Sequence, residues 1–159
     1  MNRNQQTYET ASIVNYYTQL NALQPAEQMM LDRWSEHLPR FRMLDIGVGA
    51  GRTTKHFQPR VADYVGIDVS AEMIDACQNR FPQLTASTFQ VCDARDLSVF
   101  KDDSFDFILF SFNGIDYVSH DDRLRILTEV HRVGVSGAIF YFSSHNLQGL
   151  DRAFDFKSQ

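Results

Sequence analysis

The sequence contains little cysteine, no long hydrophobic run and no excess of positive charge. Its two cysteines, Cys77 and Cys92, are not spaced like metal ligands. No cluster of His, Asp and Glu has metal-ligand spacing either. We therefore expect two free thiols, a reducing compartment and no bound metal.

The apolar residues are scattered rather than continuous. No run approaches the roughly 18 residues that a membrane-spanning helix needs. The opening stretch MNRNQQTYET lacks the apolar core of a secretory signal, so we expect a cytoplasmic protein with no membrane partner. The net charge of −5, from 15 basic and 20 acidic residues, argues against nucleic acid binding through a broad basic surface.

A length of 159 residues suits one domain, and 43% hydrophobic residues suffice for a buried core. Before residue 40 the apolar spacing predicts two helices, one around Ile13–Leu20 and one that begins at Pro25 and continues to Leu38. After residue 40, short apolar strands alternate with helices. The predicted strands are Phe41–Ile46, Tyr64–Ile67, Phe89–Cys92, Phe105–Phe112 and Ala138–Phe142.

Helices are predicted between these strands, with a turn at Gly134–Gly137 before the last one. They run from about Arg52 to before Pro59, over Ala71–Arg80 behind an N-cap at Ser70, and over Asp121–Val133. This alternation predicts an α/β fold: a three-layer αβα, doubly wound arrangement around a mainly parallel sheet of about five strands. Ligands of such sheets bind beyond the carboxyl ends of the strands, which directs attention to the residues that follow each strand.

Three glycines follow the first predicted strand, in Asp45-Ile46-Gly47-Val48-Gly49-Ala50-Gly51. Glycines let a ligand approach the backbone, and the next helix offers free N–H groups to an anion. Asp68 stands 17 residues beyond Gly51, at the end of the second strand, where its carboxylate can accept hydrogen bonds from ribose hydroxyls. Asp93 follows the third strand and can accept from an adenine amino group.

These stretches together resemble class I, Rossmann-like S-adenosylmethionine-dependent methyltransferases. The glycine stretch is similar to the first motif of that family, and the resemblance extends in order from Phe41 to Leu147. The later motifs are matched by Tyr64-Val65-Gly66-Ile67-Asp68-Val69-Ser70-Ala71-Glu72-Met73, by Phe89-Gln90-Val91-Cys92-Asp93-Ala94, and by Ser104-Phe105-Asp106-Phe107-Ile108-Leu109.

The resemblance implies S-adenosylmethionine as cofactor and assigns residues to it. Gly47, Gly49 and Gly51 would line its methionine and ribose portion, and Asp45 would support the loop and the amino-acid end. The other implied cofactor contacts are Asp68 with the ribose, Val69 and Met73 near the adenine, Asp93 and Ala94 at the adenine edge, and Phe110 and Ser111 beside the methionine. The family also implies that residues 1–40 pack on or cap this site, which residues 41–159 form.

The family's reaction is methyl transfer by in-line displacement, which needs a general base only when the acceptor must lose a proton. No catalytic motif stands out. The candidates are His145, after the fifth strand, and Tyr117, either of which can instead be an ordinary loop or packing residue. We expect a small-molecule acceptor, and the sequence does not name it.

The fifth predicted strand is followed by only 17 residues, and Gln148–Gln159 contains no pair of strands. Family members usually continue with a helix and an antiparallel hairpin, so we expect the sheet to lack that hairpin and to expose an apolar edge. Either the chain is a piece of a longer enzyme, or a second copy covers the edge in a homodimer.

Two other functions stay open. One is a catalytically silent S-adenosylmethionine-binding module. The other is an NAD(P)-dependent oxidoreductase, although its G-x-G-x-x-G fingerprint differs from the G-x-G-x-G found here.

Overall fold

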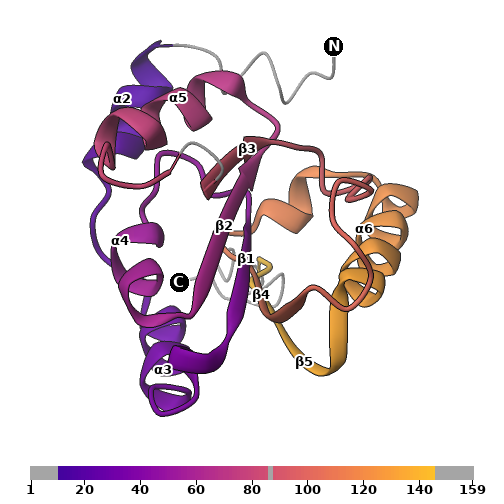
Figure 1. The fold of residues 1–159 in the computed structure, drawn as a ribbon. Helices are drawn as coiled ribbons and strands as arrows, with labels where there is room; N and C mark the ends of the chain where they lie inside the picture. The colour runs from indigo at the N-terminus through magenta and orange to yellow at the C-terminus, as the bar shows by residue number, and fades with distance from the viewer. Residues whose placement is uncertain (1–10, 86–87, 146–159) are drawn as a thin grey trace, which may run out of the picture.

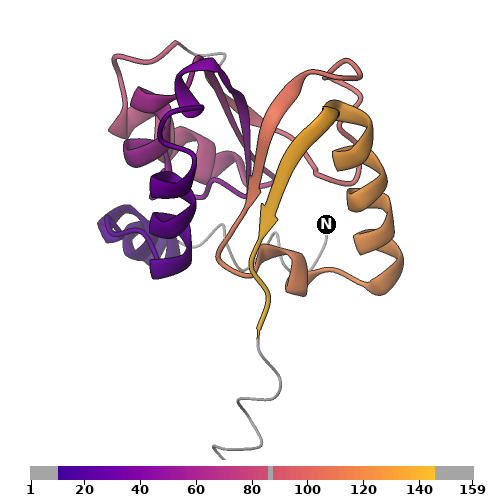
Figure 2. The ribbon, with the colours of Figure 1, turned by 90° about the horizontal axis from the view of Figure 1, so that it is seen from below.

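The computed structural model describes residues 11–85 and 88–145, which form a five-stranded sheet between two helical layers (Figures 1 and 2). All strand pairs are parallel, in the order β3-β2-β1-β4-β5. The strands are β1 (Arg42–Ile46), β2 (Asp63–Asp68), β3 (Phe89–Val91), β4 (Phe105–Phe110) and β5 (Gly134–Phe142). The predicted α/β, Rossmann-like fold is confirmed.

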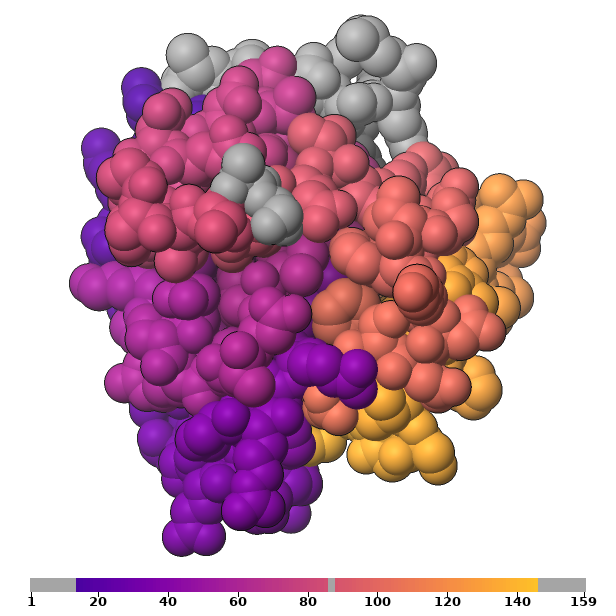
Figure 3. Space-filling model, in the orientation of Figure 1, coloured from indigo at the N-terminus to yellow at the C-terminus, as the bar shows by residue number. Residues whose placement is uncertain are grey.

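The helices divide between the two faces of the sheet. Figure 1 shows α3, α4 and α5 on one side of the strands and α6 on the other, with α2 beside α5. The α-helices are α2 (Ala11–Gln19), α3 (Pro25–Arg33), α4 (Thr54–Phe57), α5 (Ala71–Arg80) and α6 (His120–Val133). Short 3-10 turns are η1 (Leu38–Arg40), η2 (Gln58–Arg60) and η4 (Gly114–Tyr117). In the space-filling view the early segments form one flank and the last segments the opposite one (Figure 3).

The sheet separates two hydrophobic cores. On the α6 side, Leu44 and Ile108 pack with Val130 and other apolar residues of that layer. On the other side, Met43 and Phe107 belong to a second cluster with residues of α3, α4 and α5. Adjacent residues of β1 and β4 thus face opposite cores, which explains why these strands are apolar throughout.

Two predicted helix starts are confirmed. Ser70 caps α5, with its Oγ accepting from the backbone N–H of Met73, and the helix has the predicted bounds. Pro25 is the first residue of α3, where its missing N–H leaves no helical hydrogen bond unmade.

Several predicted boundaries shift by one or two residues, such as the fourth strand, which ends at Phe110 rather than Phe112. Two others are wrong by more. The second helix ends at Arg33 rather than Leu38, because the chain turns at Trp34 and buries Leu38 in a separate 3-10 turn. The turn predicted at Gly134–Gly137 belongs to β5 as an irregular stretch, in which the pairing with β4 shifts register and Gly137 adopts a φ of +83°.

Within the described residues, β5 pairs with β4 alone and forms one edge of the sheet. Phe142 at its end has 47% of its surface exposed. Gln148–Gln159 lies outside the described residues, so the predicted absence of a hairpin there and the covering second copy stay predictions, as does the domain boundary at residue 40.

Candidate functional site

A cavity opens at the carboxyl ends of β1, β2 and β4, where the sequence predicts the cofactor. Most of the predicted residues line it: Gly47, Gly49, Asp68, Val69, Met73, Asp93, Ala94, Phe110, Ser111 and Tyr117. Sequence reasoning did not assign several further lining residues, which are Ile46, Cys92, Arg95, Phe112, Gly114, Val118 and Ile126. Tyr17 of α2 also lines the cavity, as expected of a capping helix.

The three glycines of the loop do different things. Gly47 and Gly49 border the cavity at φ values of +66° and +55°, which L side chains rarely adopt. Gly51 does not border the cavity. It has a φ of +79°, and a Cβ there would lie 2.5 Å from the ring of Phe81. Gly51 therefore allows the loop to pack on α5 and its end, and its predicted cofactor contact stays a prediction.

Asp45 lies beneath the loop, buried and outside the lining of the cavity. Its Oδ2 accepts hydrogen bonds from Thr53 Oγ1 at 2.5 Å and from the Tyr64 hydroxyl at 2.7 Å. Burial raises the pKa of Asp45 to about 6, against the opposing effect of these two donors. This geometry agrees with the predicted support of the loop.

Side chains from α5 and α3 hold the same loop. The Cys77 thiol donates to the Gly49 carbonyl at 3.0 Å, and Arg80 donates to the Ala50 carbonyl at 2.9 Å. Arg52 pairs with Glu27 of α3, which joins the N-terminal helices to the loop. The loop is therefore preorganised by its own protein contacts.

Asp68 presents its carboxylate to the cavity while fixing two turns. Its Oδ2 accepts from the Gly49 N–H at 3.0 Å, and its Oδ1 accepts from the Ser70 N–H at 2.9 Å. Burial raises the pKa of Asp68, although these N–H donors act in the opposite direction. The Val69 N–H is a third donor to this carboxylate, which still retains acceptor capacity because a carboxylate offers about four lone-pair positions.

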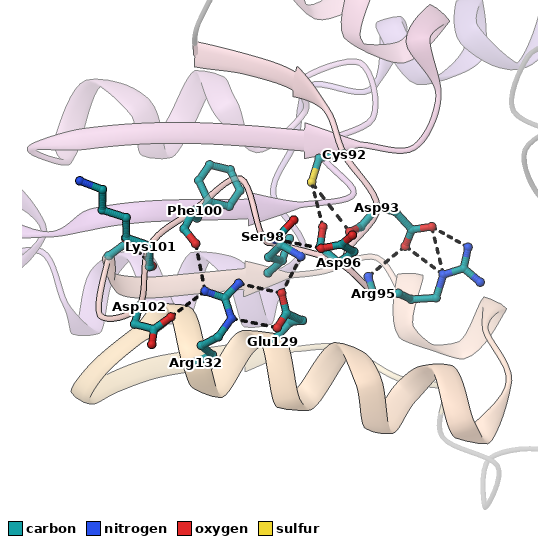
Figure 4. Close-up of polar contacts among 12 residues, drawn as sticks. Cys92, Asp93, Arg95, Asp96, Ser98, Phe100, Lys101, Asp102, Glu129 and Arg132 are labelled. Atoms are coloured by element: carbon teal, nitrogen blue, oxygen red, sulfur yellow. Dashed lines mark hydrogen bonds and ion pairs between the residues drawn. The ribbon is translucent and has the colours of Figure 1, made fainter.

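Asp93 is already engaged by a neighbour, as Figure 4 shows. Its Oδ2 lies 2.5 Å from Arg95 Nη2, and Arg95 reaches Asp122 of α6 at 3.4 Å. Burial acts to raise the pKa of Asp93, but the hydrogen bonds from Arg95 outweigh it and lower that pKa. Arg95, which the sequence did not assign to the site, lines the cavity, and its neighbour Asp96 is exposed.

The segment between β3 and β4 is fastened to α6 (Figure 4). Glu129 accepts from the Leu97 N–H at 2.7 Å, and Arg132 donates to Glu129, to Asp102 and to the Phe100 carbonyl. These contacts hold Asp93 and its neighbours in place from the side opposite the glycine loop.

The segment after β4 closes the front of the cavity. Phe112 and Asn113 both have positive φ values, 59° and 61°. The next residue, Gly114, has no room for a side chain, because a Cβ there would clash with the Phe110 ring. The Phe112 ring meets Tyr17 edge-on at 6.1 Å, so α2 and this segment form one rim. Consecutive left-handed residues of this kind often mark functional sites.

His145 stands behind that rim and does not line the cavity. Its Nδ1 lies 2.7 Å from Asp116 Oδ2, and its ring meets the ring of Tyr117 edge-on at 6.4 Å. Tyr117 itself lines the cavity. The two predicted catalytic residues are therefore neighbours, and their catalytic roles stay predictions.

In residues 11–85 and 88–145, no group of three or more His, Cys, Asp and Glu residues is arranged to hold a metal ion. No helix there is long and apolar enough to cross a membrane.

Comparison with known sequences points to one family. Residues 43–137 match the methyltransferase domain family. The chain is 32% identical over 114 residues to magnesium-protoporphyrin O-methyltransferase of Rhodobacter capsulatus, covering 70% of this chain and 49% of that protein. It is 33% identical over 108 residues to the uncharacterized methyltransferase YcgJ of Bacillus subtilis, covering 65% and 40%. The chain thus spans about half or less of these relatives.

Solved structures agree. The structure of Bacillus subtilis YcgJ superposes with a TM-score of 0.67 at 28% identity, covering 81% of this chain and 56% of that one. An S-adenosylmethionine-dependent methyltransferase from Mesorhizobium loti gives 0.63 at 27% identity, covering 76% and 54%. With a matching family over most of the chain and the same fold in these structures, the chain belongs to the methyltransferase domain family.

Proposed function

We propose that the chain binds S-adenosylmethionine in this cavity and transfers its methyl group to a small-molecule acceptor. The observation that carries the proposal is the convergence of Gly47, Gly49 and the Asp68 carboxylate on one cavity. The relatives named as methyltransferases support the reaction class. The proposal applies the cofactor of the Mesorhizobium loti protein to this chain.

The residues fit the cofactor along the length of the cavity. Asp68 has acceptor capacity left for a ribose hydroxyl beside its three backbone N–H donors. Apolar side chains from α5 and from two connecting segments, Met73, Val69 and Val118, offer a surface for the adenine ring. The Asp93 carboxylate already accepts hydrogen bonds from the Arg95 side chain. Recognition of the adenine amino group there requires the same carboxylate to accept from the adenine as well.

The protein's own work in this reaction is positioning. The cofactor, when bound, supplies a methyl group that is already activated. The anchored glycine loop and Asp68 fix one end of the cavity, and the rim of Tyr17 and Phe112 limits access of water. The acidic net charge favours a small acceptor over a nucleic acid.

The test is calorimetric titration of the purified chain with S-adenosylmethionine, S-adenosylhomocysteine and NADH, followed by detection of S-adenosylhomocysteine formed with a panel of metabolites. We expect both sulfur compounds to bind, NADH not to bind, and at least one metabolite to be methylated. Binding of NADH alone would indicate an oxidoreductase. Binding of the sulfonium without turnover would indicate a silent binding module.

A further inference from the structure

A hydrogen-bonded group built around Asp116 and His145 lies next to Tyr117, outside the lining of the cavity. Asp116 Oδ2 accepts from the His145 backbone N–H and faces His145 Nδ1, both at 2.7 Å. Asp116 Oδ1 accepts from the Ser144 hydroxyl at 2.8 Å. Three contacts thus join η4, after β4, to the residues that follow β5.

These contacts determine the tautomer of the imidazole. The Asp116 carboxylate can only accept, so the proton of a neutral His145 lies on Nδ1. On the other side, Asn113 Nδ2 lies 3.2 Å from Nε2 and is a donor, so Nε2 carries a lone pair. The imidazole is therefore held with its basic nitrogen directed away from Asp116, toward Asn113.

Asn113 does not itself line the cavity, but it holds this nitrogen next to residues that do. Phe112 and Gly114, on either side of Asn113, both line the cavity, as does Tyr117, whose ring touches that of His145. When Nε2 gains a proton, rotation of the Asn113 amide presents its Oδ1 in place of Nδ2. Asn113 can therefore hydrogen-bond to both the neutral and the protonated imidazole.

We propose that Asp116 and His145 act as a proton-accepting dyad in which His145 is the general base, Asp116 is its positioning residue, and the methyl acceptor is a hydroxyl. This inference rests on the proposed function and deepens it. A hydroxyl is a weak nucleophile until its proton leaves, whereas a neutral amine or a thiolate attacks without a base.

The hydroxyl oxygen forms a bond to the methyl carbon while the carbon–sulfur bond breaks and its electron pair returns to sulfur. The hydroxyl proton passes to His145 Nε2. The products are a methyl ether, S-adenosylhomocysteine and an imidazolium beside Asp116, which returns its proton to water because His145 is 56% exposed.

The charged surroundings favour this role. Asp116 and Tyr117 of η4 face the imidazole, and Arg123 of α6 donates to the backbone carbonyl of Asp116. Hydrogen bonds from the His145 backbone and from Ser144 lower the pKa of Asp116, which keeps it ionised beside an imidazolium.

The first test is the tautomer, read by ¹⁵N NMR of the imidazole nitrogens, with His145→Gln identifying the signal. We expect the Nδ1–H form to dominate in neutral His145 and to lose that dominance in Asp116→Asn. A dominant Nε2–H form in the wild-type chain would overturn the proposal.

The second test is kinetic, with a panel of hydroxyl, amine and thiol acceptors. We expect hydroxyl methylation, a fall in kcat of about 10²-fold or more in His145→Gln, and loss of the acidic limb of its pH profile. Asp116→Asn should lower kcat less than His145→Gln does. Both variants should bind S-adenosylmethionine as the wild type does, and the exposed-site controls His131→Gln and Asp75→Asn should retain full activity.

The outcomes separate the two proposals. If the cofactor binds but no hydroxyl is methylated, or if His145→Gln keeps the acidic limb, the dyad is refuted and the cofactor site stands. If S-adenosylmethionine does not bind at all, the proposed function fails and the dyad fails with it.

Discussion

Glu27 and Arg52 form a two-point ion pair in which both side chains are nearly fully buried. Glu27 Oε2 lies 2.5 Å from Arg52 Nη1, and Oε1 lies 2.6 Å from Nη2. Glu27 also accepts from the Gln24 N–H at 2.7 Å and so caps the helix that carries it. Arg52 in turn lies over the Phe112 ring, 4.9 Å from its centre. One pair thus connects α3, the glycine loop and the rim of the cavity.

Removing one member of this pair should destabilise the chain strongly. Glu27→Ala leaves the Arg52 charge buried and unpaired, and we expect a loss of about 3–5 kcal/mol in the free energy of unfolding by urea. Glu36→Ala on the exposed surface is the matched control and should change stability by less than about 0.5 kcal/mol. A loss in Glu27→Ala no larger than in the control would contradict the structural role.

The free energy of unfolding should depend on pH through the titration of Asp45. Its pKa in the folded state is about 6, above the ordinary value near 3.8, so the folded chain holds this proton more tightly than the unfolded chain. The Asp45 contribution therefore favours folding below about pH 4 and is lost as pH rises to about 6, by on the order of 3 kcal/mol.

Asp45→Asn removes that titration while keeping an oxygen acceptor for Thr53 and Tyr64. We expect the difference in unfolding free energy between wild type and variant to change with pH between about 4 and 6 and to be flat above it. Thermal or urea unfolding at several pH values measures this. A constant difference across that range would show that Asp45 does not titrate there.

Alanine substitutions at Gly51 and Gly137 should separate the stability cost of backbone strain from the cost of a steric clash of the new Cβ. Both glycines have a φ near +80°, but a Cβ at Gly137 meets nothing within 4 Å, whereas one at Gly51 meets Phe81. Gly137→Ala should cost roughly 1–2 kcal/mol of stability. Gly51→Ala should cost about 1–3 kcal/mol more. Equal losses would mean that Phe81 yields without cost.

Asp68→Ala should weaken binding of S-adenosylmethionine by about 1.5–3 kcal/mol, the scale for hydrogen bonds to a charged group. The control is Asp63→Ala, at the exposed opposite end of the same strand. Calorimetry measures the affinity, and a melting curve confirms that both variants fold. Unchanged affinity in folded Asp68→Ala would refute its assignment to the ribose.

The exposed edge of β5 predicts self-association. If a second copy covers it, sedimentation should show a dimer that Phe142→Lys weakens, while Val99→Lys, which changes an exposed apolar residue in a loop, does not. A wild-type chain that stays monomeric at all concentrations would contradict the prediction that a second copy covers the edge of β5.

The sequence was informative where the chemistry is local. Apolar strands that end in glycine or aspartate predict the sheet and place Asp68 at its edge, and Ser70 predicts the start of α5 because a cap needs only the next turn. The irregular start of β5 was missed because Gly134 and Gly137 are typical of turns, and only pairing with β4 keeps them in a strand.

Contacts between distant residues could not be predicted in this way. Glu27 and Arg52 are 25 residues apart, and no periodicity connects them. Spacing alone does not tell which glycine faces a ligand, so Gly51 was grouped with Gly47. Arg95 was not assigned to the site, because its partner Asp122 lies on a helix whose packing only the fold determines. The sequence singled out His145 but offered no sign of Asp116 as its partner.

The two ends of the cavity are fastened to opposite layers of the molecule. The glycine loop is tied to α3 and α5 through Arg52, Arg80 and Cys77, and the Asp93 segment is tied to α6 through Glu129 and Arg132. A ligand that reaches from one end to the other would act as a cross-brace between the layers. Its binding energy would then resist separation of α6 from the sheet as well as opening of the loop, and hydrogen exchange would slow on both faces at once.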